Sequence, residues 1–126
     1  MLPDAFRVIE AWGFTYKSVA FCWVKRNRMS TGWFVGLGFW TRANVELCLL
    51  ATKGNPRRMA KDVGQIIEAP AEAHSKKPEE ASRRIERLLG DVPRLELFAR
   101  QPSEGWHVWG NEVESDIVLE GGQLNQ

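Results

Sequence analysis

The stretch at residues 93–111 reads P-R-L-E-L-F-A-R-Q-P-S-E-G-W-H-V-W-G-N and decides the expected fold. Its first part predicts a short apolar strand over residues 95–99, and its second part is a polar loop rich in tryptophan and glycine. Open α/β sheets bind ligands outside the carboxyl ends of their strands. We therefore expect a strand that leads into a ligand-binding loop, with the rest of the chain building the sheet behind it.

The composition is that of one ordinary globular domain. A length of 126 residues is enough for one hydrophobic core, and 44% hydrophobic with 26% charged residues excludes a disordered chain. The net charge of +1 excludes a general attraction to nucleic acid or membrane. Binding of either kind must come from a local patch.

The two cysteines and the hydropathy pattern predict the compartment. Cys22 and Cys48 lie in apolar runs, so we expect both to be buried and reduced, and their isolation predicts no metal site. The sequence shows no signal-peptide pattern and no apolar stretch long enough to span a bilayer. We expect a cytoplasmic protein without a membrane partner.

The first half of the chain predicts a helix and two strands. Residues 3–12 carry apolar side chains at helical spacing and are followed by Gly13 as a stop. Residues 15–25 form a near-continuous apolar run, typical of a strand covered on both faces. Residues 45–52 predict a strand that pairs antiparallel with it, because a loop and not a helix connects the two.

The connecting segment at residues 26–44 is long and mixes arginines with aromatic residues and three glycines. Long ordered loops inside compact domains are usually functional. The aromatic content argues against disorder. A second basic cluster follows in the sequence at Arg57, Arg58 and Lys61.

The second half predicts a strand at residues 63–68 ended by Pro70, a helix that begins at Pro78, and a frayed tail at residues 116–126. In the helix, three arginines are expected to face solvent and four apolar residues to face inward: Arg83, Arg84 and Arg87, against Ala81, Ile85, Leu88 and Leu89.

Loop aromatic and histidine residues admit two interpretations. Three of the six tryptophans (Trp40, Trp106 and Trp109) fall in expected loops, where each either packs as a lid on its own domain or stacks on a ligand. His74 and His107 are far apart in sequence, so they predict neither a metal site nor a catalytic pair and are interpreted as ordinary loop residues.

Four blocks of the sequence, taken together, resemble one family. They are W-G-F-T-Y-K…F-C-W-V-K (12–25), G-L-G-F-W-T-R…E-L-C-L-L-A-T-K-G-N-P (36–56), H-S-K-K-P-E-E…R-I-E-R-L (74–88) and L-E-L-F-A-R…G-W-H-V-W-G-N-E (95–112). The pattern is similar to the S-adenosylmethionine-dependent methyltransferases of the adenine 6-amino group. That family includes the eukaryotic messenger-RNA adenine methyltransferase and bacterial and phage DNA enzymes. The G-W-H-V-W-G-N-E loop is nearer to the bacterial and phage branch.

The resemblance implies an α/β, Rossmann-like methyltransferase fold. Residues 1–115 would be the C-terminal portion of that domain and residues 116–126 a tail. The implied cofactor is S-adenosylmethionine, and the positions that match its pocket are Lys77, Glu96, Arg100, Ser103, Asn111 and Glu112. Their chemistry suits the ribose, carboxylate and adenine groups of the cofactor.

Two of these positions keep a structural alternative. Lys77 directly precedes a helix start and would otherwise be a solvated surface lysine. Glu96 lies within a strand and would otherwise mark the outward face of an edge strand. Asn111 has little structural explanation and is the strongest single candidate.

The same resemblance implies a target base held by the segment at residues 36–46. Enzymes that act on a base extrude it, stack it and hold its edge by hydrogen bonds. The substrate candidates are Trp40, which would stack, Arg42, which would meet a phosphate, Glu46 near the adenine, and Ser75. A packed Trp40 and a solvent-exposed Arg42 without a role are the alternatives.

The catalytic block of that family, Asp-Pro-Pro-Trp, does not occur in the 126 residues. We therefore assign no catalytic residue, and expect the fold to lack central strands, to expose a sheet edge, and to be inactive alone. A truncated enzyme is favoured over one half of a split enzyme and over a degenerate relative. The expected partners are nucleic acid, DNA ahead of RNA, and a chain that supplies the block. The alternative function is a non-catalytic nucleic-acid-binding or partner subunit that uses the 26–44 loop.

Overall fold

The computed structural model describes residues 2–27, 32–36, 40–71, 77–99, 101–110, 118–120 and 123–125. The chain divides into two compact units, Met1–Gly90 and Asp91–Gln126, called here the first and the second unit. Together their described elements have the mixed α/β content that the sequence predicts, with both helices in the first unit. Within the described ranges, no helix has the length and apolar character that a membrane crossing requires.

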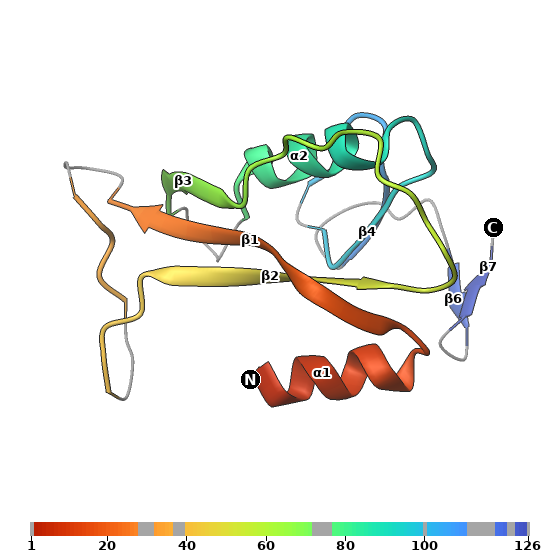
Figure 1. Ribbon diagram of the computed structural model, residues 1–126, viewed down its shortest axis with the longest axis horizontal. Helices are drawn as coiled ribbons and strands as arrows, with labels where there is room; N and C mark the ends of the chain where they lie inside the picture. Colours follow the sequence, from red (N-terminus) through yellow and green to blue (C-terminus); the bar gives the residue numbers. More distant parts are fainter. Residues whose placement is uncertain are drawn as a thin grey trace. The chain divides into compact units, whose positions relative to one another are not determined.

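The first unit contains two helices and a three-stranded sheet, in the chain order α1 (Leu2–Ala11), β1 (Thr15–Arg26), β2 (Val45–Thr52), β3 (Ile66–Pro70) and α2 (Glu79–Leu89). The strand order is β2-β1-β3, with β1 antiparallel to β2 and parallel to β3. The predicted antiparallel pairing is confirmed. Figure 1 shows α2 running along β3 and β1.

The third strand begins later than predicted and continues through Pro70. Cys22 N donates to Gln65 O at 2.9 Å, so the alternation along β3 directs the nitrogen of Pro70 away from β1. A proline costs no ladder bond at such a position. For this reason Pro70 belongs to the strand and does not end it.

The core of the first unit lies between the sheet and α2. Its buried residues are Phe21, Trp23 and Ile67, with Ala81 and Ile85 of α2 packed against them. The Trp23 indole nitrogen donates to the carbonyl oxygen of Ala69 at 2.9 Å, which satisfies its polar atom inside the core. The inward direction predicted for Ala81 and Ile85 is confirmed, whereas Arg84, predicted to face solvent, donates to the backbone oxygens of Gly64 and Ile66 at the edge of β3.

The expectation that β1 is covered on both faces is wrong. Cys22 and Val24 point away from α2 and are only half-buried. The residues paired with them are exposed: Val45, Leu47 and Ile66. Among the described residues, α2 covers one face of the sheet, whereas Val45, Leu47 and Ile66 on the other face stay exposed.

The cysteines differ from the expectation in burial. Both are free thiols, but Cys22 is half-buried and Cys48 is exposed. Burial of the sulfur atom, and then the nearby Glu46 carboxylate, raise the pKa of the Cys48 thiol. In the described part of the chain, no group of three metal-ligating side chains comes together.

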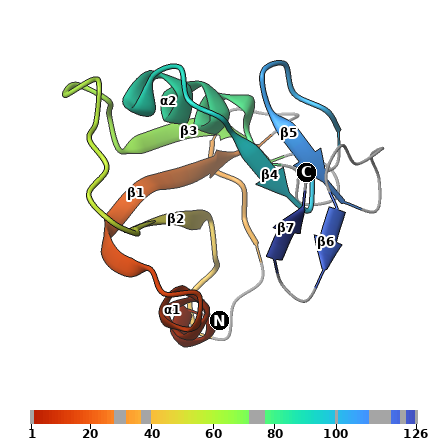
Figure 2. The same cartoon turned by 90° about the vertical axis from the view of Figure 1, so that its right-hand side faces the viewer.

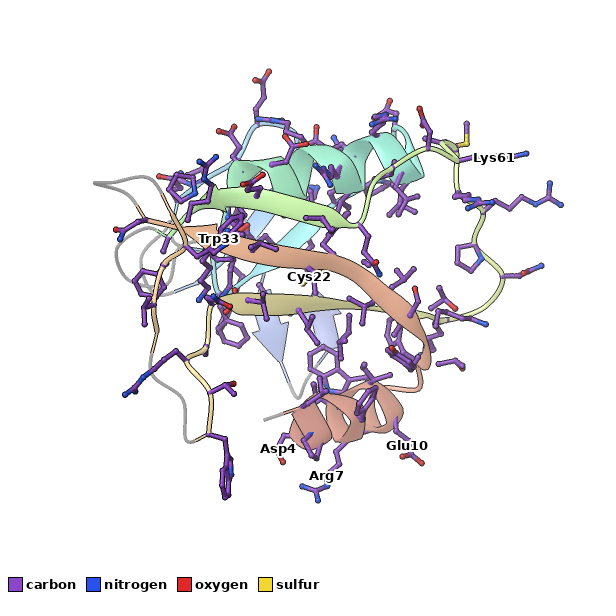
Figure 3. The ribbon with its side chains drawn as sticks, turned by 60° about the vertical axis from the view of Figure 1, so that its left-hand side comes forward. Asp4, Arg7, Glu10, Cys22, Trp33 and Lys61 are labelled. Carbon is purple, nitrogen blue, oxygen red and sulfur yellow. The ribbon has the colours of Figure 1, made fainter. Side chains whose placement is uncertain are left out.

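Helix α1 packs only lightly on the sheet. Phe6 meets Tyr16 edge-to-face at 4.9 Å between ring centroids, and none of the helix residues is buried. Its polar residues Asp4, Arg7 and Glu10 point away from the strands (Figure 3). The predicted stop is confirmed, since the chain leaves the helix through Gly13 at a φ of 79°.

The second unit contains four short strands: β4 (Leu95–Leu97), β5 (His107–Trp109), β6 (Val118–Glu120) and β7 (Gln123–Asn125). β4 and β5 pair in parallel, and β6 and β7 pair antiparallel, as Figure 2 shows. His107 and Trp109 were expected in a loop but lie in β5, and the expected frayed tail contains a hairpin. Strands of three residues are too short to show a period in sequence.

Strand β4 is shorter than predicted because Phe98 leaves the extended conformation. Its φ is 60°, a left-handed value that is uncommon for a residue other than glycine. The backbone of Gly110 lies so close that a Cβ at that position would collide with the backbone oxygen of Ala99. Ala99 N donates to Trp109 O at 2.9 Å, which holds this contact together.

Candidate functional site

One candidate site lies in the first unit, at the carboxyl ends of the parallel strands β1 and β3. Glu46, the second residue of β2, is paired with Trp23 and shares the face that α2 covers. Lys77 lies two residues before α2 and its Nζ contacts Glu46 Oε2 at 2.7 Å. The structure therefore brings together one residue predicted to face the cofactor and one predicted to face the adenine.

A cation and two aromatic rings lie at the same end of β1. Lys25 Nζ is 5.1 Å from the ring centroid of Trp23 and 6.0 Å from that of Phe34. Phe34 is tied to this position because its backbone nitrogen donates to the oxygen of Lys25 at 2.9 Å. Trp33 also forms an isolated bridge with Arg26, so the start of the returning chain is anchored to β1.

Beyond this anchor, the predicted base-binding residues project into solvent. Trp40 is 98% exposed, so the alternative of a packed Trp40 is wrong. Arg42 is exposed as well and forms no ion pair within the described residues. An exposed indole and a guanidinium two residues apart suit stacking on a base and contact with a phosphate.

The basic cluster of Arg57, Arg58 and Lys61 lies at the other end of the sheet. Figure 3 shows Trp33 near the carboxyl end of β1 and Lys61 beyond the opposite end. The eight residues of β2 separate the two ends, which is about 26 Å at roughly 3.3 Å a residue. The cluster is therefore separate from the Glu46–Lys77 pair.

The second unit carries a candidate site of its own, where the parallel strands β4 and β5 both end. Glu96 lies there half-buried, and desolvation raises the pKa of its carboxyl group. A carboxylate in partial shelter from water is a strong acceptor for hydroxyl groups. Ser103 is half-buried nearby in sequence, and its backbone oxygen accepts from Trp106 N at 3.1 Å.

Phe98 is a candidate that the sequence pattern did not reveal. Its side chain is 75% exposed and its backbone is left-handed, and it meets Trp109 edge-to-face at 5.3 Å between ring centroids. Non-glycine residues held at such angles concentrate at ligand sites. The unusual conformation of Phe98 is visible only in its backbone angle, because the sequence L-F-A at residues 97–99 predicts a continuing strand.

For Trp106, the structure favours packing on its own unit over stacking on a ligand. The Arg94 guanidinium lies 5.9 Å from the ring centroid of Trp106, and Arg94 Nε donates to Gly105 O at 3.2 Å. This indole therefore packs on its own unit. Five other residues named by the sequence lie outside the described ranges: His74, Ser75, Arg100, Asn111 and Glu112.

Comparisons with known proteins identify the family. The model of the MT-A70 family matches residues 3–112. The chain belongs to the MT-A70 family. The relatives include the Type II methyltransferase M.MunI of a Mycoplasma species, 34% identical over 111 residues that make up 86% of this chain and 45% of M.MunI.

Eukaryotic members of the family are similar to nearly the same extent. The N(6)-adenosine-methyltransferase MT-A70-like protein of Arabidopsis thaliana is 33% identical over 90% of this chain and 17% of its own length. The catalytic subunit METTL3 of Homo sapiens is 32% identical over 89% of this chain and 20% of its own length. The chain thus spans less than half of each of these relatives.

Proposed function

We propose that this chain is part of an S-adenosylmethionine-dependent methyltransferase of the adenine 6-amino group, with a Rossmann-like fold, acting on DNA in the cytoplasm. The observation that carries the proposal is the 2.7 Å contact between Lys77 and Glu46. It joins a position that the family resemblance assigns to the cofactor with one that it assigns to the base. Similarity to a Type II methyltransferase supports the choice of DNA.

The residues at the end of β4 fit the cofactor. When bound, S-adenosylmethionine supplies an electrophilic methyl group on a positively charged sulfur. Glu96 would accept hydrogen bonds from the ribose hydroxyl groups, for which its raised pKa makes it a strong acceptor. The exposed ring of Phe98 offers a stacking surface for a purine.

The residues at the end of β1 fit the target base. Trp40 would stack on the extruded adenine and Arg42 would contact a neighbouring phosphate. Glu46 would accept a hydrogen bond from the adenine edge, and Lys77 fixes the direction of that carboxylate. The amino group of adenine is a weak nucleophile, because its lone pair is delocalised into the ring, so orientation by such contacts is a large part of what the protein contributes.

The isolated chain is proposed to bind its ligands without turning them over, because the Asp-Pro-Pro-Trp block comes from a further segment of the enzyme or from a partner. Calorimetry with S-adenosylmethionine tests the cofactor part, with Asn111→Ala and Glu96→Gln as binding-defective variants and Val92→Ala, an exposed position of the same unit, as the control. Equal affinity in all four proteins contradicts the cofactor site. Methyl transfer by the chain alone contradicts the need for the missing block.

A second candidate function is nucleic-acid binding without catalysis. The observation that favours it is the exposure of two indoles, Trp33 at 51% and Trp40 at 98%, on one basic segment. Binding of single-stranded DNA should weaken with rising salt and weaken further in Trp40→Ala. An affinity for single-stranded DNA that does not change with salt, or that is the same in Trp40→Ala, contradicts this candidate function.

A further inference from the structure

The turn between β2 and β3 carries the basic cluster of Arg57, Arg58 and Lys61. These three cations fall within five consecutive residues, and all three side chains are exposed. Figure 3 shows Lys61 at the end of the sheet opposite Trp33. The Glu46–Lys77 pair lies at the carboxyl ends of β1 and β3, so the cluster is not part of that site.

The backbone that carries the cluster is fixed to α2 and the residue after it. Met59 N donates to Leu88 O at 2.7 Å, and the Met59 side chain lies against Gly90, where a Cβ would come within 2.9 Å of Met59 Cγ. Asp62 forms an ion pair with Arg87. The turn is therefore held at two points, and a ligand that binds the cluster does not have to order its backbone.

The charges of the cluster are not neutralised by the part of the first unit that the structure describes. Arg57, Arg58 and Lys61 form no ion pair, hydrogen bond or ring contact with a described residue. The carboxylate nearest to them in sequence, Asp62, is bound by Arg87. Five arginines of the same unit each pair with a carboxylate: Arg7, Arg26, Arg83, Arg84 and Arg87. In a chain of net charge +1, the cluster is thus a local excess of positive charge that attracts an anionic partner.

A cation without a carboxylate partner also lies at the other end of β2. Arg42 forms no ion pair within the described ranges and is two positions from the exposed Trp40. The eight residues of β2 span about 26 Å at roughly 3.3 Å a residue. Double-helical DNA rises about 3.4 Å for each base pair, so this length corresponds to roughly eight base pairs. A duplex is an anionic partner long and stiff enough to contact both ends of the strand.

We propose that the basic cluster binds the phosphate backbone of the DNA duplex about eight base pairs away from the target adenine. The proposal rests on the proposed function and adds a contact outside the base-binding segment. Arg57 and Arg58 bind phosphate oxygens through paired hydrogen bonds, and Lys61 adds a point charge. Phosphate contacts carry no sequence information, but they fix the orientation of a protein on DNA. The cluster therefore orients the duplex so that the target base meets Trp40 and Arg42.

Duplex binding by the full chain tests the cluster. Arg57→Gln/Arg58→Gln removes two arginines without carboxylate partners among the described residues, and the control Arg7→Gln/Arg83→Gln removes two that are paired. Both double variants lower the net charge equally, so total charge does not explain a difference between them. Each protein is titrated with a long and a short duplex centred on one mismatched adenine, with about twelve and about four base pairs on each side. Thermal melting checks that each variant is folded.

On the long duplex, we expect Arg57→Gln/Arg58→Gln to weaken binding at least about tenfold at about 0.1 M salt. The slope of the logarithm of the binding constant against the logarithm of the salt concentration should become shallower by about two. The control variant on the long duplex, and both variants on the short one, should stay within about threefold of the unaltered chain.

Four results overturn the proposal: no duplex binding by the unaltered chain, an equal loss with the control variant, an equal loss on the short duplex, or binding to phosphatidylserine vesicles that needs the two arginines while DNA binding does not. Failure of S-adenosylmethionine to bind counts against the proposed function instead. It leaves a loss that depends on duplex length as support for the phosphate contact.

Discussion

The outer edges of β3 and β2, the two outer strands of the first unit, differ in what lies against their backbone groups. At β3, Arg84 occupies the outward carbonyl oxygens of Gly64 and Ile66. At β2, the outward groups of Val45 and Leu47 have no strand beside them in the described part of the chain. The same contrast separates the two faces of the sheet, since α2 covers one and leaves the other apolar and exposed. In this small sheet, Arg84 therefore covers one edge and α2 covers one face, whereas apolar residues at the other edge and on the other face are exposed.

Adjacent isoleucines give the strongest test of the two faces. Ile67 is 1% exposed and Ile66 is 64% exposed. Ile67→Ala should lower the free energy of unfolding by about 3 kcal/mol, through lost burial and the cavity left behind, and Ile66→Ala by at most about 0.5 kcal/mol. Chemical denaturation of the full chain measures both. Equal losses would mean that the second face is covered after all.

Two neighbouring arginines of α2 test the protected edge. Arg84 binds two backbone oxygens of the β3 edge, whereas the ion pairs of Arg83 with described residues are those with Glu79 and Glu86 of its own helix. Arg84→Ala should cost about 1–3 kcal/mol of unfolding free energy, and Arg83→Ala much less, because its ion pairs are exposed to solvent. Denaturation and light scattering check this, because freed β3 carbonyls should also promote aggregation. A larger loss of unfolding free energy with Arg83→Ala than with Arg84→Ala would refute the inference that Arg84 protects the β3 edge.

The Glu46–Lys77 pair is expected to matter for binding more than for stability. Both side chains are accessible, Lys77 at 61% and Glu46 at 36%. A double-mutant cycle with Glu46→Gln and Lys77→Met should give a coupling of about 0.2–1 kcal/mol that largely disappears in about 1 M salt. A coupling that resists salt would show a buried pair and a closed site instead.

The smallest expected effect is the pH dependence of the second unit at Glu96. Desolvation raises the pKa of this carboxyl above its ordinary value of 4.5, so the folded state holds the proton more tightly than the unfolded state. The contribution of Glu96 to stability should therefore fall as the pH rises from about 4.5 through the raised value. Glu96→Gln should remove this slope and change stability at neutral pH by about 0.5 kcal/mol or less. An unchanged pH profile of the melting temperature would contradict the desolvation of Glu96.

The bounds of the long periodic segments were predictable, whereas those of the short strands β3 and β4 were not. The patterns of residues 3–12, 15–25 and 45–52 led to α1, β1 and β2 with ends correct to one residue. β5 was missed because the three residues His107–Trp109 carry no measurable period. Arg84 was assigned to solvent because helical spacing says which face a residue occupies, and not that a long side chain reaches past its helix to two carbonyl oxygens.

The candidate site divides in the same way. Lys77 and Glu46 were named from the family pattern, but their contact across 31 positions of sequence depends on how β2 and the start of α2 meet. Phe98 was not named, because the residues around it give no sequence signal for a left-handed backbone at a phenylalanine.

The sequence by itself determined the family, the long elements and the types of residue available for binding a cofactor and a base. Periodicity and motif order are properties of the sequence itself, so they can be recognised without the structure. The tertiary structure alone decided that Arg84 caps one edge of the sheet, whereas no strand within the described ranges pairs with the other edge at Val45 and Leu47. It also decided which apolar residues lack a cover. Those features depend on which strand lies beside which, and strand order comes from contacts between segments far apart in sequence.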